Sequence, residues 1–443
     1  MKGPTSTGRS FGRDEPGYEE ARRAAVWNDR TPARFPDLIV QAATDADVVA
    51  AVRAASELGS GLGVRSGGHS WAGNHLRDGG VLLDVSALSS YAIDATAMTA
   101  TAGPGCRGDE LLAALAERDL FFPAGHCRGV ALGGYLLQGG FGWNGRVHGP
   151  ACMSVAAIDV VTAAGELVRA DAETEPDLFW AARGAGPGFF GVVIRFHLRL
   201  YPRPRHVANA VQLYSIDALE EVFAWAQEVG PRVPREVELM LILHRDLEGE
   251  PELAVTAPTL VDSAEEAAEA LSFLRTCPAL GQAKLDVPGV EVGIPDLYAA
   301  VHESYPDGHR YAVDNMWTHA PAAELAPGLR RIAETMPAAP SHMLWMNWGP
   351  SPERPEMAYS VEDETYIALY GVWSDPAEDA ANLAWPTERM REMEHLASGI
   401  QLADENLGRR PARFVSEENL ARLDEVRARY DPDGLFHEWM GRP

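Results

Sequence analysis

Glycine is concentrated in one short segment of this chain, and that segment limits the folds available to the chain. Eight glycines lie between Gly125 and Gly145, a density far above the roughly 7% of an average protein. Glycine adopts positive φ angles and lets the backbone approach another group closely. We therefore expect this segment to lie against a flat or phosphorylated ligand.

A second glycine-rich stretch, Val64 to Gly73, follows an expected helix and a short apolar strand. The backbone amides of residues 66–70 can wrap an anion there, because glycines permit the turns and the close approach that a pyrophosphate needs. The stretch does not match the G-x-G-x-x-G fingerprint of dinucleotide-binding βαβ units. His69 ends the loop, and composition alone leaves open whether it is a structural cap or a chemical group.

Cys127 lies inside the first glycine-rich segment and is a second candidate for chemistry. Its neighbours His126 and Arg128 could lower the pKa of its thiol toward the thiolate. The alternative is an inert buried thiol. A metal site is a further alternative, because thiolate and imidazole ligands could close a tetrahedron, although it would leave the glycine loops unexplained. Its ligands would be His126, Cys127, His148 and Cys152.

The length and charge of the chain limit the kinds of protein that it can be. With 443 residues, 46% of them hydrophobic, it exceeds the usual size of a single core, so we expect two domains or one domain interrupted by another. Lys and Arg number 38 against 64 Asp and Glu, and the net charge of −26 would repel phosphate backbones and anionic lipids. We expect no nucleic-acid or membrane partner.

The cysteine count and the first residues bear on where the protein works. Four cysteines are too few and too scattered for a disulfide framework. Residues 1–19 are polar and hold no apolar stretch suited to a signal peptide or a membrane span. We expect a cytoplasmic protein that is a monomer or a homodimer.

The hydrophobic pattern divides the chain into two kinds of structure. Residues 37–65 show a β-α-β rhythm around a helix expected over 45–58, with Asp45 and Asp47 at its entry. After about residue 202, strand-like runs alternate with acidic helices, and a sheet covered by helices on one face is the simplest architecture for them. The expected strands there are 238–244, 252–256, 311–319, 342–348 and 365–373, and the expected helices are 263–275, 322–335 and 376–397.

Three motifs together resemble the bicovalent branch of the vanillyl-alcohol oxidase type flavoproteins, and most of all the berberine bridge enzyme-like group. They are V-R-S-G-G-H-S-W-A-G at 64–73, P-A-G-H-C-R-G-V-A-L-G-G-Y at 123–135, and A-R-G-A-G-P-G-F-F-G-V-V at 182–193. The resemblance covers nearly all of residues 20–205 and returns at 430–436. It implies an α+β fold, in which an FAD-binding domain of residues 1–204 and 398–443 is interrupted by a substrate-binding domain of residues 205–397, built on an antiparallel sheet covered by helices.

The resemblance also implies the cofactor and its attachment. FAD would be joined through the imidazole of His69 to its 8α-methyl group and through a thioether from Cys127 to its C6 atom. Val130 would face the side where oxygen approaches, and a small side chain there resembles the oxidase pattern, with O2 as electron acceptor and hydrogen peroxide as product. The residues placed on or beside the FAD are Arg65, Ser66, Gly67, Gly68, His69, Ser70, Cys127, Val130, Gly133, Gly134, Gly139, Gly140, Gly142 and Val193.

The sequence departs from the family where relatives often carry a catalytic tyrosine in a Tyr-x-Asn-Tyr segment. The corresponding stretch, 399–404, reads G-I-Q-L-A-D, so the usual phenolic base is absent and Gln401 is expected to keep the polar role of the asparagine. Residues 437–440 read H-E-W-M where relatives often show an Asn-Gln-Asn run. The base must then come from elsewhere, and Tyr370, His319 and Tyr135 are the candidates, in that order.

The expected reaction is oxidation of a small molecule. A hydride would pass to flavin N5 from a C–H that bears a hydroxyl or an amine, in a sugar, a secondary alcohol, a phenolic compound or an alkaloid-like amine. The alternative is a flavin-dependent dehydrogenase, or an oxidative cyclase of secondary metabolism, that makes little use of O2.

Overall fold

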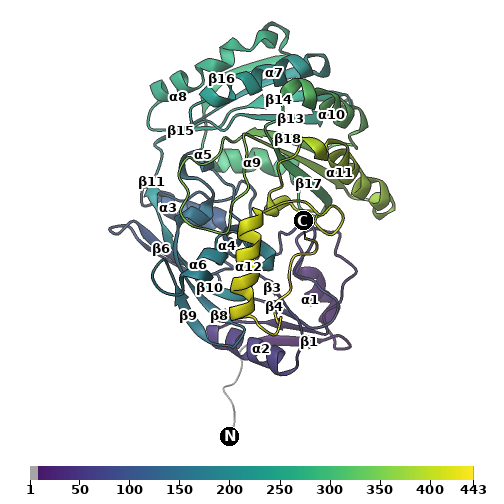
Figure 1. Cartoon of the computed structure of the whole chain (residues 1–443). Helices are drawn as coiled ribbons and strands as arrows, with labels where there is room; N and C mark the ends of the chain where they lie inside the picture. Colours follow the sequence, from purple (N-terminus) through teal and green to yellow (C-terminus); the bar gives the residue numbers. More distant parts are fainter. Residues whose placement is uncertain (1–7, 443) are drawn as a thin grey trace.

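The computed structural model describes residues 8–442 of the chain. Figure 1 shows an upper half built on one large sheet and a lower half that holds the glycine-rich loops, with the C-terminal helix α12 (Glu417–Tyr430) returning to the lower half. Arg422 and Arg429 of this helix pair with Asp177 in the lower half, the first at 3.1 Å. The C-terminal segment of the chain therefore packs on the lower half, which is formed by the N-terminal part of the chain.

The lower half contains two main sheets. The first has the order β1-β2-β4-β3, in which β2, β4 and β3 run parallel, and the second is antiparallel with the order β5-β6-β10-β8-β9. Their strands are β1 (Arg9–Gly12), β2 (Leu38–Gln41), β3 (Leu62–Arg65), β4 (Val81–Asp84), β5 (Tyr91–Asp94), β6 (Thr99–Ala102), β8 (Val155–Thr162), β9 (Leu167–Ala170) and β10 (Gly191–Arg199), and the short pair β7 (Leu120–Phe121) with β11 (Tyr201–Pro202) adds a third sheet. The helices of this half are α1 (Tyr18–Ala24), α2 (Asp45–Glu57), α3 (Gly108–Ala116), α4 (Leu132–Leu137), α5 (Gly145–His148) and α6 (Pro176–Ala182).

Helix α2 shows how closely local sequence determines the first β-α-β unit. Thr44 is its N-cap: the Thr44 hydroxyl accepts the amide of Asp47, and the Asp47 carboxylate accepts the amide of Thr44, which forms a capping box. Val48 and Val52 are fully buried on one face. The expected helix over 45–58 is confirmed, with its cap one residue earlier than expected.

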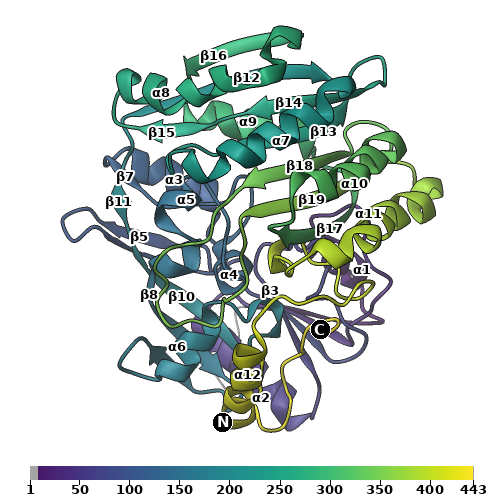
Figure 2. The same ribbon diagram turned by 45° about the horizontal axis from the view of Figure 1, so that its top comes forward.

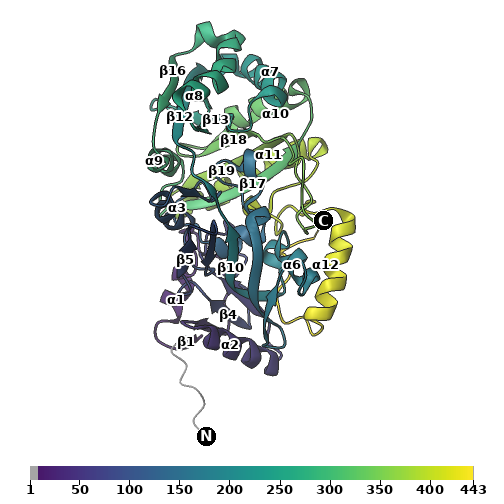
Figure 3. The same ribbon diagram turned by 90° about the vertical axis from the view of Figure 1, so that its left-hand side faces the viewer.

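The upper half is an eight-stranded sheet, antiparallel throughout, with the order β15-β12-β14-β13-β18-β19-β17 and with β16 paired to β12. Figures 2 and 3 show α7, α10 and α11 over its outer face, while its other face is turned toward the lower half. The strands are β12 (His206–Ser215), β13 (Met240–Arg245), β14 (Pro251–Thr256), β15 (Thr259–Val261), β16 (Leu285–Glu291), β17 (Arg310–Thr318), β18 (His342–Asn347) and β19 (Thr365–Trp373). The helices are α7 (Leu219–Val229), α8 (Ala264–Ala270), α9 (Ile294–Ser304), α10 (Ala322–Thr335) and α11 (Asp379–Met393).

Strand alternation places one set of side chains in the core under the helices. Leu241, Leu253 and Trp345 are at most 1% exposed and belong to the same hydrophobic cluster as residues of α7, α10 and α11. The predicted α+β class and the helix-covered antiparallel sheet are confirmed. The domain boundaries at 204 and 397 stay a prediction.

Candidate active site

A cavity of about 520 Å³ lies between the glycine-rich loops and the open face of the eight-stranded sheet. Both halves of the molecule line it. Every residue that the sequence placed on the FAD lines this cavity except Gly139, Gly140 and Gly142.

The first glycine loop is held by contacts that need glycine. Strand β3 ends at Arg65, whose guanidinium pairs with Asp84 of the adjacent β4 at 3.0 Å. Gly68 has φ +76°, its carbonyl accepts the amide of Trp27, and a Cβ on it would stand 2.4 Å from a backbone oxygen of Ala25. A side chain here would push the loop off its neighbours. The loop is therefore a fixed rim of the cavity.

The second glycine loop packs directly on the first. The Ser66 hydroxyl accepts the amide of Gly134 at 3.2 Å, and a Cβ on Gly133 would stand 2.4 Å from that hydroxyl. A Cβ on Gly134, in contrast, would meet no protein atom within 4 Å. No protein atom covers Gly134 where it lines the cavity, so a ligand can lie against its backbone.

Several of the side chains that line the cavity also carry buried polar atoms for which the described residues offer no hydrogen-bond partner. These atoms include Asn74 Oδ1, His75 Nε2, Trp317 Nε1 and His437 Nε2. Buried polar atoms are ordinarily paired. A ligand rich in hydrogen-bonding groups, as FAD is, fits a cavity with this lining. His437 stands where the sequence departs from its relatives, and it still faces the cavity.

The environment of His69 leaves its imidazole neutral. Its ring stacks on Trp27 with centroids 4.7 Å apart, and burial lowers its pKa to about 4. A neutral imidazole has a free nitrogen lone pair, which the formation of a bond to carbon requires. His69 is therefore in the protonation state that attachment needs.

Cys127 corrects an expectation about thiol reactivity. Burial, with a smaller contribution from Asp404, raises its pKa to about 12, so the thiolate is disfavoured. The predicted activation by its neighbours is wrong: His126 turns its ring to Glu238, with Nε2 2.9 Å from the carboxylate, and Arg128 donates to the carbonyl of Pro295. A bond from this thiol to a ligand would require a base or the ligand itself to remove the proton.

A buried carboxylate, Asp404, forms the polar centre of the cavity. Its side chain accepts hydrogen bonds from the indole of Trp71 at 2.6 Å, from the phenol of Tyr370 at 2.8 Å and from the phenol of Tyr366. Burial raises the pKa of Asp404, and the three donors oppose that rise. Burial and the nearby Asp404 charge raise the pKa of Tyr370 well above its usual value, so this phenol is protonated.

Two rings pack around Tyr370 at the same place. His342 stacks on Tyr370 at 4.8 Å, and Tyr305 meets both rings edge-on, at 4.9 and 5.0 Å. His342 Nδ1 donates to the carbonyl of Pro340, and burial lowers the pKa of His342 to about 4. In the neutral ring, Nε2 is therefore a hydrogen-bond acceptor, and this nitrogen makes no hydrogen bond to the described residues.

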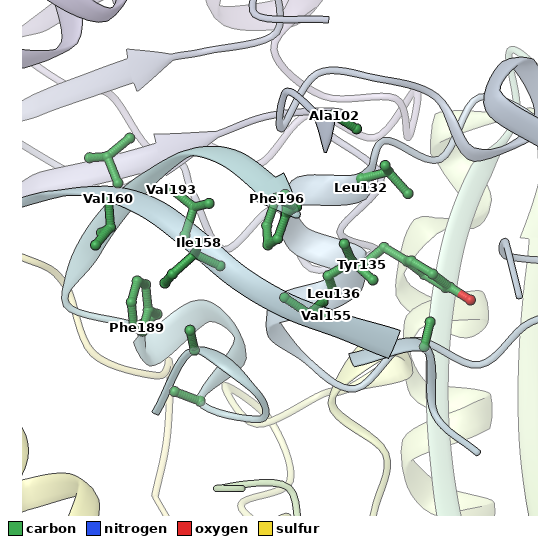
Figure 4. Packing of buried hydrophobic residues seen from close by; sticks show 14 of the residues in the cluster. Ala102, Leu132, Tyr135, Leu136, Val155, Ile158, Val160, Phe189, Val193 and Phe196 are labelled. Atoms are coloured by element: carbon green, nitrogen blue, oxygen red, sulfur yellow. The ribbon is translucent and has the colours of Figure 1, made fainter. Parts of the chain in front are cut away.

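The candidate bases fall into different places. Tyr370 lines the cavity, whereas His319 does not: strand β17 ends at Thr318, and the side chain of His319 is 73% exposed and pairs with Asp363 at 2.7 Å. Tyr135 touches the cavity, but its hydroxyl donates to the carbonyl of Pro123 at 2.6 Å. Figure 4 shows its ring packed in the core beside Leu132 and Leu136. His319 is therefore excluded as a base, and Tyr135 is a core residue.

Gln401 and the three outlying glycines complete the predicted residues. The backbone of Gln401 exchanges hydrogen bonds with the Asn315 side chain, and its own side chain lines the cavity without a described partner. Gly139 packs against Tyr359, and Gly140 and Gly142 pack against Tyr135. The structure explains these three glycines by protein packing.

Sequence reasoning did not single out Asp404. The residue lies in the 399–404 stretch, where the family tyrosine is missing. An acidic residue in the stretch that lacks the usual base is the sequence feature that could have indicated Asp404. Its partners Trp71 and Tyr366 gave no such signal, because only the folded chain brings them together.

The metal alternative finds no support. His148 stacks on Tyr201 with ring centroids 3.9 Å apart, and the Cys152 thiol lies against the sulfur of Met357. Within residues 8–442, no group of three or more His, Cys, Asp or Glu side chains could hold a metal ion. In that same range, no helix combines the length and the apolar character needed to cross a membrane.

Fold and site together define an FAD-binding oxidoreductase. Residues 36–171 match the family model described as an FAD binding domain. An FAD-linked oxidoreductase of Hypoxylon pulicicidum is 33% identical over 94% of this chain and 93% of its own, and the xylooligosaccharide oxidase of Thermothelomyces thermophilus is 38% identical over 42% of this chain and 38% of its own. A solved structure of a BBE-like protein of Physcomitrella patens superposes with a TM-score of 0.85, at 21% identity, over 98% of this chain and 96% of that one.

The chain belongs to the FAD-linked oxidoreductases, and its fold is the one seen in the berberine bridge enzyme-like structure. The predicted family and the predicted oxidoreductase activity are confirmed.

Proposed function

We propose that this protein is an FAD-dependent oxidase that oxidises a C–H group bearing a hydroxyl or an amine on a small organic substrate, with O2 as the electron acceptor and H2O2 as the second product. The observation that carries the proposal is the buried Asp404 carboxylate, bonded to Tyr366 and Tyr370 inside the cavity that the glycine loops line. The oxidase name of the Thermothelomyces thermophilus relative supports the same reaction class.

The chain's own residues provide a route for one proton. Tyr370 is a protonated phenol that already donates to Asp404, so it can accept the proton of a substrate hydroxyl or amine while it passes its own proton to the carboxylate. The raised pKa of Asp404 makes this carboxylate a stronger base than an exposed one. The bound flavin supplies the hydride acceptor. Asp404 is thus the terminal base and Tyr370 the group that faces the substrate.

The proposal includes attachment of FAD at His69 and Cys127. Its support is that both residues line the same cavity, that His69 is neutral, and that Gly129, two residues after Cys127, lies beside His69, where a Cβ would stand 3.3 Å from Nε2. A cytoplasmic monomer or homodimer also remains part of the proposal, on the strength of the few cysteines and the net charge.

A second function keeps the site but changes the electron acceptor. A dehydrogenase or oxidative cyclase that makes little use of O2 would share the FAD and the Tyr370–Asp404 pair. The missing family tyrosine supports this second function. The absent phenol leaves the usual oxidase base set incomplete.

The deciding experiment measures the two half-reactions separately. The purified yellow protein is mixed anaerobically with panels of alcohols, sugars and amines, and flavin bleaching at its visible band is followed. Oxygen is then admitted to the reduced protein, and reoxidation and H2O2 are measured. Fast reoxidation with stoichiometric H2O2 supports the oxidase. Slow reoxidation by O2 but fast reoxidation by an artificial acceptor would replace it with the dehydrogenase.

A further inference from the structure

The sheet side of the cavity carries apolar side chains from four adjacent strands. Met240 of β13 lies opposite Met346 of β18, and Ile242 lies opposite Leu344 of β18 and Ala254 of β14. We call the six side chains that form this surface the apolar wall: Val211, Met240, Ile242, Ala254, Leu344 and Met346, all of which line the cavity. Strands are spaced about 4.8 Å apart, so the wall from β12 to β18 is about 14 Å wide.

Four side chains of the apolar wall, Val211, Ile242, Ala254 and Leu344, are only partly buried, whereas Met240 and Met346 are buried. Their neighbours along the strands, such as Leu241 and Leu253, are 0% exposed beneath the helices. Apolar side chains left toward a cavity are the usual lining of a site for an apolar ligand. The wall is therefore surface that a ligand can cover.

Helix α9 adds apolar side chains to the same cavity. Leu297, Ala300 and Val301 repeat at helical spacing and line the cavity. Tyr298 on the same helix donates to the carbonyl of Gly125 at 2.9 Å, which anchors the helix beside the Cys127 loop. The ligand space is thus apolar on the sheet side and on the helix side.

Charge is almost absent from this part of the lining. Among the described residues that line the cavity, Asp404 is the only acidic one, although the chain as a whole carries a net charge of −26. Asp404, Tyr370 and His342 form a polar corner of the cavity. On the strands of the wall, the polar residues Asn209 and Thr256 also line the cavity, and the Thr256 hydroxyl donates to the Asn209 side chain at 3.0 Å. Each sugar hydroxyl that is buried without a partner would cost binding energy, and the apolar wall offers none.

We infer that the substrate is an alcohol or amine with a large hydrocarbon body, of several fused rings or of a long chain, whose single reacting group meets the corner of Asp404, Tyr370 and His342. This inference rests on the proposed function and adds the substrate class to it. The body lies on the apolar wall, and the reacting hydroxyl or amine donates to Tyr370, against which the ring of His342 stacks. Oligosaccharides are excluded as substrates.

The test measures binding separately from turnover. The flavin-loaded protein is titrated with cyclohexanols that carry alkyl chains of increasing length, and Kd is read from the flavin absorption and from quenching of tryptophan fluorescence, since Trp71 and Trp317 line the cavity. Each added methylene should tighten Kd by about fourfold until the wall is covered. Xylo-oligosaccharides should cause no change over the same concentrations.

Variants locate the effect on the wall. Ile242→Asn and Leu344→Asn should flatten the dependence on chain length, and Ile242→Ala and Leu344→Ala provide the same test with a smaller change if the amides disturb folding. Val290→Asn is the matched control, because Val290 is a strand residue of the same sheet that is 45% exposed and lies outside the cavity. It should keep the full dependence.

The outcomes separate the two proposals. The proposed substrate class is wrong if Kd does not depend on the length of the alkyl chain, or if Kd decreases with longer oligosaccharides. This conclusion holds whatever reaction follows binding. Chain-length-dependent binding without flavin reduction by any bound alcohol or amine supports the substrate class and refutes the oxidase. Val290→Asn flattening the dependence as strongly as Ile242→Asn would also overturn the wall as its origin.

Discussion

The proposed base makes a prediction about rate and pH together. Replacing Asp404 by Asn keeps the shape of the side chain but removes the acceptor for the proton that Tyr370 passes on. General-base groups contribute about 10²–10⁴-fold. We therefore expect the rate of flavin reduction to fall by at least about 10²-fold in stopped-flow measurements, with a much smaller change in substrate Kd.

The sign of the pH dependence follows from the direction of the pKa shift. Only the ionised Asp404 accepts a proton, so the reduction rate rises with pH through the folded pKa of Asp404, which burial places above the ordinary value. The hydrogen bond from Tyr366 lowers that pKa, so Tyr366→Phe should move the acid limb to higher pH while it leaves the plateau rate nearly unchanged. Asp404→Asn should lack the limb.

A double-mutant cycle completes the test. Because Tyr370 and Asp404 act as one unit, Tyr370→Phe combined with Asp404→Asn should cost little more than either change alone. Additive losses would show that the two residues work independently. An unchanged acid limb in Asp404→Asn would place the base elsewhere and refute the relay.

Three further outcomes are expected. His69→Ala and Cys127→Ala should each retain flavin in the acid-precipitated pellet through the other bond, and the double variant should release it; complete release from either single variant would contradict two attachments. Gly134→Leu should lower the flavin-to-protein ratio sharply without loss of thermal stability, because a Cβ at Gly134 meets no protein atom. Gly142→Ala should instead lower the free energy of unfolding by about 1–3 kcal/mol, because its Cβ would stand 2.1 Å from a backbone oxygen. Equal effects of the two variants on flavin content would count against the assignment of Gly134 to the cofactor. His319→Ala should leave flavin reduction unchanged, because that side chain is 73% exposed, and a large loss of rate would reinstate it as a base.

The parts of the fold that sequence predicted best are those fixed by local signals. The β-α-β start follows from a capping box and an apolar stripe, and the glycine loops follow from a resemblance carried by short motifs. Strand β12 and helices α7 and α9 were not predicted. Helix α9 has buried residues only at Leu297 and Tyr298, so its apolar face toward the cavity is a weak periodic signal.

The errors at the site share one physical cause, which is that a pattern along the chain does not show where an element ends or what it faces. In the expected strand 311–319, two-residue alternation puts Trp317 and His319 on one face. Trp317 does line the cavity, but the strand ends at Thr318 and His319 turns to solvent. The family resemblance placed Gly140 and Gly142 beside the cofactor, yet their missing side chains make room for Tyr135. A glycine in the sequence indicates that another group approaches the backbone closely, but it does not show whether that group is a ligand or a side chain of the protein.

Asp404 shows why the centre of the site needed the folded chain. Trp71, Tyr366 and Tyr370 converge on it from distant parts of the sequence, and no cation is among the groups that shift its pKa. A buried carboxylate without a cation is costly, and hydrogen bonds offset only part of that cost. Because its folded pKa is raised, the proton is bound more tightly in the folded state, so the stability that protonated Asp404 contributes is fully present below its unfolded pKa and is lost as pH rises through the folded pKa. A carboxylate that opposes stability where it is ionised, held by two phenols at the end of an apolar wall, is best explained by the proton transfer it can perform.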